Sequence, residues 1–161
     1  MFHSNTYLSE KKYNWNGVLI EAVPRYKDIL LDSEHNCFKL RDIAVYKEDD
    51  KKIEFCVNEI KGWSGIKSSL PGRENNKIIK VKTKTLTSIL DEINAPKDID
   101  LLSLDVEGIK GLDLEKYKVK MILVELNKDC STEFHNEILK ILSNYTILKK
   151  DVLDTFFILK H

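Results

Sequence analysis

The chain has 161 residues, a length that predicts one domain spanning residues 1–161. Its hydrophobic share of 42% and its charged share of 32% are typical of a folded globular protein and argue against general disorder. Lys and Arg together number 26, as do Asp and Glu, so the formal net charge is zero. This balance argues against a protein that binds nucleic acid through a strongly basic surface.

The first half of the chain predicts alternating helices and strands. Ser4 is a good N-cap for a helix over 4–13, and Asn16-Gly17 is a turn signal before the apolar run 18–20. A short continuous run of this kind is typical of a strand that is covered on both faces in a parallel sheet. The other elements expected in this half are a helix over 24–33, strands over 39–46, 52–58 and 78–83, and a loop over 58–76.

The second half repeats this alternation, beginning with a helix over 87–94 that ends before Pro96. The apolar runs 99–104 and 119–124 predict two further buried strands. The last expected elements are a helix over 131–143 and an antiparallel pair of strands over 145–148 and 155–159. Strands that alternate with helices predict an α/β fold with a mostly parallel sheet.

Three cysteines, Cys37, Cys56 and Cys130, lie far apart and have no C-x-x-C spacing. We therefore expect neither a disulfide framework nor a structural zinc site among the cysteines, and a reducing, cytoplasmic compartment. No apolar run approaches the length of about 18 residues that is needed to span a membrane. The first residues also carry no apolar signal segment, so we expect no association with a membrane.

Three acidic residues, Glu21, Asp105 and Glu125, stand at the ends of apolar strands. Open α/β sheets bind their ligands outside the carboxyl ends of the strands, so these acids predict a ligand site. We expect the three strands to be parallel members of one sheet, with the three acids at the same edge. For each acid taken alone, the alternative is a polar residue that simply ends a strand at the rim of the sheet.

Three motifs follow one another with a characteristic spacing. The first runs from Ser4-Asn5-Thr6 to Gly17-Val18-Leu19-Ile20-Glu21, and the second runs from Val81-Lys82-Thr83 to Leu90. The third contains Leu104-Asp105-Val106-Glu107-Gly108 and ends at Leu123-Val124-Glu125-Leu126-Asn127. In this order, and extending over most of the chain, the motifs resemble those of the FkbM family of S-adenosylmethionine-dependent methyltransferases.

The resemblance implies a Rossmann-like methyltransferase sheet, mostly parallel with a C-terminal antiparallel strand pair, that binds S-adenosylmethionine at its carboxyl edge. The implied reaction is methyl transfer to an oxygen, often the hydroxyl of a sugar or of another small molecule. Because the sulfonium is a strong methyl donor, such an enzyme must chiefly align donor and acceptor and remove the hydroxyl proton. The implied partner is a small-molecule or carbohydrate acceptor.

The resemblance also implies roles for individual residues. By position in the family motifs, Glu21 would hold the cofactor ribose, and Asp42 and Ile43 would lie near the adenine. Asp105 would lie beside the cofactor and the acceptor, and Glu107 completes the same motif. A carboxylate at Asp105 or Glu107 can take up the acceptor proton or bind a metal that lowers the pKa of the acceptor. For Glu107 the alternative is an acid that complements a helix dipole.

Two departures from the family pattern bear on activity. The family's usual first strand and glycine-rich cofactor loop would precede Ser4, where this sequence has only a short stretch from Met1. Ile109 alone separates Gly108 from Lys110, so the helix that the family has there must be reduced to about one turn. We therefore expect little or no methyl transfer by the chain alone. The alternative function is a truncated or non-catalytic methyltransferase-like scaffold that self-associates through an exposed sheet edge.

Overall fold

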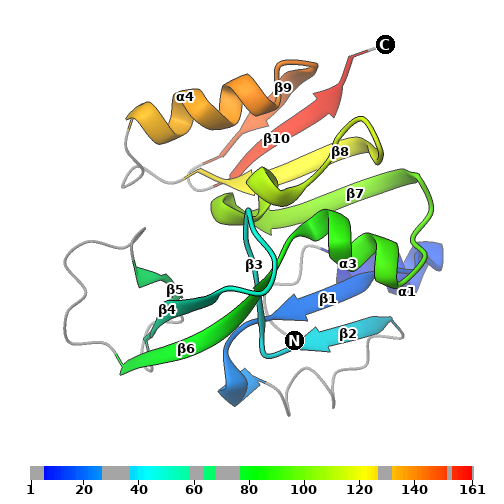
Figure 1. The fold of residues 1–161 in the computed structure, drawn as a ribbon. Helices are drawn as coiled ribbons and strands as arrows, with labels where there is room; N and C mark the ends of the chain where they lie inside the picture. Colours follow the sequence, from blue (N-terminus) through cyan, green and yellow to red (C-terminus); the bar gives the residue numbers. More distant parts are fainter. Residues whose placement is uncertain are drawn as a thin grey trace. The chain divides into compact units, whose positions relative to one another are not determined.

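The computed structural model describes residues 6–26, 37–58, 64–67, 77–126, 132–151 and 154–160 (Figure 1). The chain divides into two compact units, Met1–Lys84 (unit 1) and Thr85–His161 (unit 2). The single domain expected from the length stays a prediction. Among the described residues, no helix is long and apolar enough to cross a membrane.

Unit 1 contains two separate sheets. Its elements are α1 (Tyr7–Tyr13), β1 (Val18–Glu21), the 3-10 helix η1 (Pro24–Tyr26), β2 (Phe38–Arg41), β3 (Ile43–Val45), β4 (Lys52–Val57), β5 (Gly65–Ile66) and β6 (Lys77–Lys84). β1 and β2 form a parallel pair in which Glu21 lies opposite Arg41. The second sheet has the order β3-β6-β4-β5, with β3 parallel to β6 and β4 antiparallel to both of its neighbours.

One residue divides a strand that the sequence predicts as continuous over 39–46. Asp42 has a φ of 59°, in the left-handed region, and lies between β2 and β3, which belong to different sheets. The prediction of one strand is therefore wrong. Aspartate tolerates this conformation better than most residues, because its short side chain can hydrogen-bond to nearby backbone.

The two helices predicted in unit 1 are each described only in part. α1 begins at Tyr7, with Thr6 at its N-cap, and the predicted cap Ser4 lies outside the described residues. Of the helix predicted over 24–33, the described part is η1, and residues 27–33 lie outside the described ranges. The loop predicted over 58–76 contains the short strand β5.

The core of unit 1 lies against the four-stranded sheet. Along β6, Val81 and Thr83 are buried while Lys80 and Lys82 are exposed, which is the alternation of a strand with one covered face. The buried Thr83 hydroxyl donates to the carbonyl of Glu48 at 2.7 Å and accepts from the N–H of Lys51 at 3.1 Å. The apolar core around these strands is formed by Val23, Ala44, Phe55, Val57, Ile66 and Val81.

Unit 2 contains a single four-stranded sheet with the order β7-β8-β10-β9. Its elements are α3 (Leu86–Glu92), β7 (Asp98–Asp105), the 3-10 helix η3 (Val106–Gly111), β8 (Lys118–Glu125), α4 (Thr132–Ile141), β9 (Tyr145–Lys150) and β10 (Asp154–Leu159). β7 runs parallel to β8, whereas β10 runs antiparallel to both β8 and β9. The predicted C-terminal antiparallel pair is thus confirmed.

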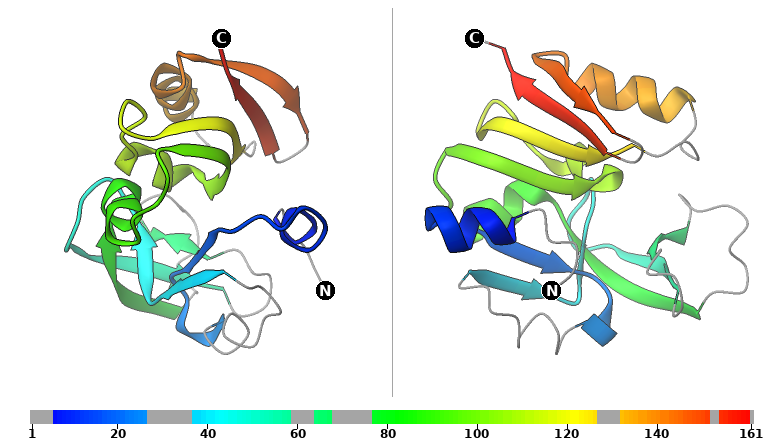
Figure 2. Two further views of the ribbon diagram at one scale, coloured as in Figure 1. Left: turned by 90° about the vertical axis from the view of Figure 1, so that its right-hand side faces the viewer. Right: turned by 180° about the vertical axis from the view of Figure 1, so that it is seen from behind.

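Helices cover one face of this sheet, on which α4, η3 and α3 all lie (Figure 2). α4 is amphipathic, and its Ile138 is fully buried together with Leu142 just beyond the helix. On the strands, Ile122 and Phe157 lie opposite each other and are buried. Burial of these large side chains is the main source of stability in unit 2.

The fold is therefore mixed α/β. β1 and β2 form a parallel pair, whereas each four-stranded sheet combines one parallel pair, β3–β6 or β7–β8, with antiparallel pairs. The strands that end at Asp105 and Glu125 are parallel neighbours, as expected. The strand that ends at Glu21 belongs to unit 1, where it pairs with β2, so one common sheet for the three acids stays a prediction. An apolar run shows that a strand is buried, but it does not show which strand is its neighbour.

Candidate functional site

Glu21 is the last residue of β1 and is half-buried. Its Oε1 accepts a 2.7 Å hydrogen bond from the backbone N–H of Val23, two residues later in the chain. The bond holds the carboxylate against its own backbone at the carboxyl end of a parallel strand. Glu21 therefore has a defined local orientation in the region where open α/β sheets bind ligands.

Two other predicted cofactor residues lie at the same end of the β1–β2 pair. Because Arg41 lies opposite Glu21, the next residue, Asp42, stands just beyond that end of the pair. Asp42 is exposed, and its left-handed backbone turns the chain into β3. Ile43 is the first residue of β3 and is half-buried. The structure thus brings together Glu21, Asp42 and Ile43 in unit 1.

The predicted catalytic residues belong to unit 2. Asp105 is the last residue of β7 and lies opposite Glu125, the last residue of β8. Glu107 follows within η3, and the next two residues, Gly108 and Ile109, are buried. Two acids therefore end neighbouring parallel strands, and a third follows in the turn that leaves β7. This group and the group around Glu21 lie in different units.

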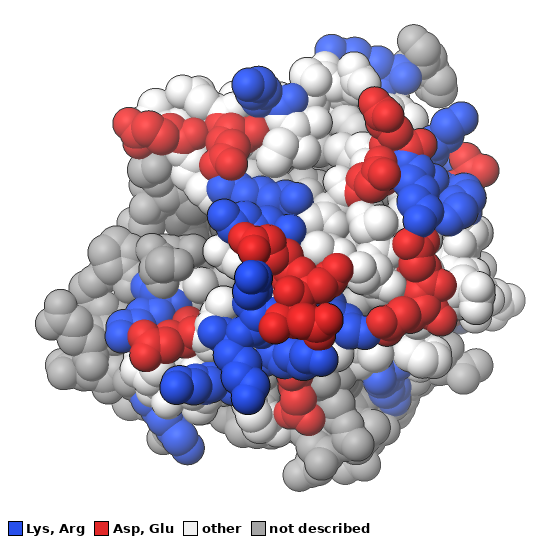
Figure 3. Space-filling model, in the orientation of Figure 1, with Lys and Arg blue, Asp and Glu red and all other residues white. Residues whose placement is uncertain are grey.

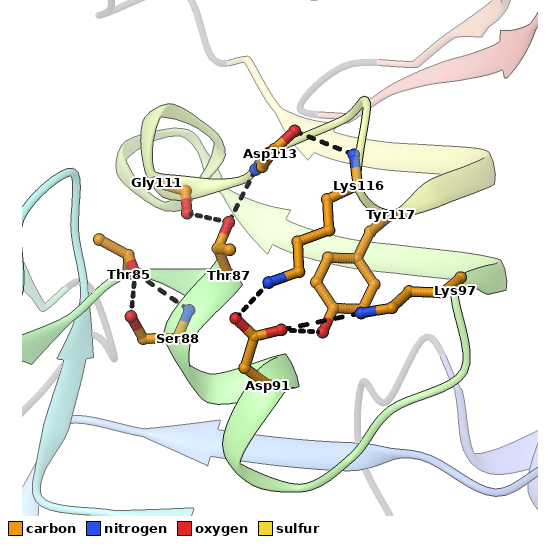
Figure 4. Close-up of polar contacts among 9 residues, drawn as sticks. All are labelled: Thr85, Thr87, Ser88, Asp91, Lys97, Gly111, Asp113, Lys116 and Tyr117. Carbon is orange, nitrogen blue, oxygen red and sulfur yellow. Dashed lines mark hydrogen bonds and ion pairs between the residues drawn. The ribbon is translucent and has the colours of Figure 1, made fainter.

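The turn that leaves β7 is attached to α3 by side chains (Figure 4). The Thr87 hydroxyl donates to the carbonyl of Gly111 at 3.0 Å and accepts from the N–H of Asp113 at 2.7 Å. The Asp113 carboxylate accepts in turn from the backbone N–H groups of Glu115 at 3.0 Å and Lys116 at 2.9 Å. These bonds connect the end of η3 to the segment that leads into β8.

Asp91, one helical turn after Thr87, is the centre of a second set of contacts on α3. Its carboxylate oxygens accept from the Lys116 ammonium at 2.6 Å and from the Tyr117 hydroxyl at 2.6 Å. These two donors hold the pKa of Asp91 below its usual range, and the same bond from Lys116 raises the pKa of that ammonium. The Lys97 ammonium lies 4.1 Å from the centre of the Tyr117 ring.

Sequence reasoning did not identify these α3 residues. The one available signal was the spacing of Thr87 and Asp91, which places two polar side chains on one face of a helix. That pattern is typical of any solvated helix face, and their partners lie 24 to 26 residues away along the chain. Only the tertiary structure brings these segments together.

Charge and metal-ligand patterns add little to this site. On the face shown in Figure 3, acidic and basic side chains are interspersed, in keeping with the net charge of zero. Among the described side chains, no group of three or more His, Cys, Asp and Glu residues is arranged to hold a metal ion.

Comparison with known proteins gives one clear match. The family model of the methyltransferase FkbM domain matches residues 2–147 and thus extends over most of both units. Among curated proteins and solved structures, none matches the chain significantly.

Proposed function

The chain belongs to the FkbM methyltransferase family, and we propose that it binds S-adenosylmethionine and methylates a hydroxyl oxygen of a sugar or another small molecule. The observation that carries this proposal is the family match over residues 2–147. It is supported by the acids that end parallel strands, Glu21 on β1 and Asp105 and Glu125 on β7 and β8. Rossmann-like sheets bind their ligands at strand ends of this kind, and we propose that arrangement for this chain.

We propose that the Glu21 carboxylate binds the ribose of the cofactor, and its local environment supports this role. Its half-buried carboxylate is oriented by the hydrogen bond from the Val23 N–H. An ionised carboxylate offers about four lone-pair sites on its two oxygens, so it can accept hydrogen bonds from ribose hydroxyls as well. Asp42 and Ile43, at the same strand end, are proposed to lie near the adenine.

The proposed chemistry assigns proton removal to the acids of unit 2. S-adenosylmethionine supplies an activated methyl group when bound. As the acceptor oxygen forms its new bond to carbon, its hydroxyl proton must leave, and Asp105 or Glu107 is proposed to accept it. Asp105 ends β7 and Glu107 lies in the turn that follows, so the proposed base stands at the carboxyl end of a parallel strand.

Calorimetric titration with S-adenosylmethionine tests the cofactor assignment. Glu21→Ala is expected to weaken binding by about 1–3 kcal/mol, the range for losing hydrogen bonds to a charged group. The matched control is Glu54→Ala, which removes an exposed carboxylate that is paired with Lys67 on the four-stranded sheet of unit 1. Equal affinities for the wild type and Glu21→Ala would reduce Glu21 to a residue of the sheet rim.

Transfer of a labelled methyl group to a panel of sugars and hydroxylated small molecules tests the reaction. Asp105→Asn is expected to lower the transfer rate, because the amide cannot take up the proton. The control Asp100→Asn changes an acid on the same strand that is exposed and paired with Lys120. Equal rates for Asp105→Asn and the wild type would remove Asp105 from the chemistry.

One observation favours the second candidate, a non-catalytic methyltransferase-like scaffold. The Glu21 carboxylate caps the backbone at Val23 and therefore already has a structural role. The proposed surface for self-association is then the free edge of β7. Within the described residues, β7 is an outer strand of its sheet. A dimer in sedimentation experiments, together with no heat on addition of S-adenosylmethionine, would favour the scaffold over the enzyme.

A further inference from the structure

η3 is the segment that carries Glu107, and much of its backbone is buried. Gly108, Ile109 and Gly111 are buried, as is Leu112 directly after the helix. Polar groups of a buried backbone need hydrogen-bond partners, and the last carbonyls of a helix have none within the helix itself. Whatever supplies these partners also decides where the helix lies.

Thr87 supplies two of them with one hydroxyl group. A hydroxyl has one proton to donate and lone pairs to accept with, and here it donates to the Gly111 carbonyl and accepts from the Asp113 N–H. It thereby binds the last residue of η3, Gly111, and also Asp113, which follows the helix. Replacement by valine keeps the branched shape but removes both bonds at once, whereas serine keeps the hydroxyl.

Asp91 fixes the next part of the same segment. Its carboxylate binds Lys116 and Tyr117, which lead into β8. Tyr117 is fully buried, so the backbone at this point is held both by packing and by the bond to Asp91. Thr87 near the start of α3 and Asp91 near its end therefore both bind the connection between β7 and β8.

α4 also contacts η3. The Lys110 ammonium of η3 binds the Glu137 carboxylate at 2.5 Å and lies 4.8 Å from the centre of the Phe134 ring. Glu137 is exposed, and exposed ion pairs of this kind contribute little to stability. Removal of the Glu137 charge therefore makes a suitable control for the loss of the Thr87 hydrogen bonds.

We propose that Thr87 and Asp91 are positioning residues, which set the path of η3 and thereby the place of Glu107 and of the adjacent strand end at Asp105. The inference rests on the proposed function for the role of those two carboxylates. The positioning itself is a property of unit 2 and can be measured without substrate.

Hydrogen exchange of the full chain tests the positioning. In Thr87→Val, the backbone amides over 106–113 are expected to exchange at least about five- to ten-fold faster, the factor that corresponds to each net hydrogen bond lost. Thr87→Ser is expected to restore the wild-type rates, and Glu137→Gln is expected to leave them unchanged. Unchanged exchange in Thr87→Val would overturn the proposal. So would an equal acceleration in β10 and α4, because it would indicate a general loss of stability.

Kinetics test the consequence for the site. With S-adenosylmethionine and an acceptor, Thr87→Val is expected to lower kcat several-fold while the KM for S-adenosylmethionine stays unchanged, and Thr87→Ser is expected to recover kcat. An unchanged kcat in Thr87→Val, despite faster exchange over 106–113, would overturn the link to Asp105 and Glu107. If the wild type neither binds nor transfers, the proposed function fails, and the exchange rates still decide whether α3 positions η3.

Discussion

The Tyr117 hydroxyl donates a 2.6 Å hydrogen bond to a carboxylate oxygen of Asp91 and so joins the start of β8 to the helix α3. Tyr117 is fully buried, whereas Asp91 is exposed, so the bond connects the core of unit 2 with its surface. The other Asp91 oxygen binds Lys116. The same carboxylate thus holds two consecutive residues of the chain.

Tyr117→Phe removes this bond and keeps the buried ring. We expect the free energy of unfolding to fall by about 1 kcal/mol, the net value of a typical hydrogen bond. Urea unfolding followed by circular dichroism measures it. Tyr13→Phe is the control, since Tyr13 is 58% exposed in α1, and it is expected to have no effect. Equal midpoints for wild type and Tyr117→Phe would show that the bond adds nothing to stability.

Stability is expected to depend on pH through Asp91. The bonds from Lys116 and Tyr117 lower the pKa of this carboxyl in the folded protein. A lowered folded pKa stabilises the protein above the pKa of the unfolded state, which is about 3.9 for aspartate. The contribution is lost as the pH falls through the lower folded value. The wild type should therefore be more stable than Asp91→Asn at neutral pH, and the difference should shrink on acidification. A difference that stays constant with pH would exclude this linkage.

Asp42→Gly is expected to change stability and binding in opposite directions. Glycine adopts the left-handed φ of 59° without strain, so we expect a gain in the free energy of unfolding of up to about 1 kcal/mol. Asp42→Ala, which keeps a β-carbon in this conformation, should lower it. If the Asp42 side chain lies near the adenine as proposed, both variants should bind S-adenosylmethionine more weakly than the wild type. Full affinity in Asp42→Gly would leave Asp42 with a backbone role only.

Thr83→Val tests the buried hydroxyl of unit 1. The variant keeps the shape but leaves the Glu48 carbonyl and the Lys51 N–H without their bonds to this side chain. A loss of about 1 kcal/mol in the free energy of unfolding is expected, the net value of a typical hydrogen bond, because Glu48 and Lys51 are exposed and water can reach them. Thermal unfolding measures it, with Thr146→Val on the exposed side of β9 as the control. Equal losses in the two variants would contradict a specific role for the Thr83 hydroxyl.

The strands that bear the proposed site were predictable, because short apolar runs that end in an acid have few other interpretations. β1, β7 and β8 lie where those runs predict them, and Asp105 and Glu125 end up opposite each other. Features that depend on a single backbone angle or on distant partners were not predictable. The φ of Asp42 divides one predicted strand into two, and the bonds of Thr87 join residues that are far apart in the chain.

The place of β10 in its sheet has a consequence for synthesis and truncation. β10 is the last strand among the described residues, yet it lies between β8 and β9 rather than at an edge of the sheet. On the ribosome, β8 and β9 are therefore complete before the strand that joins them has been made. Removal of residues 154–160 would take away the strand to which β9 pairs and expose the buried edge of β8 at Ile122 and Val124. A short deletion at this end should therefore damage the sheet more than the loss of an edge strand of equal length.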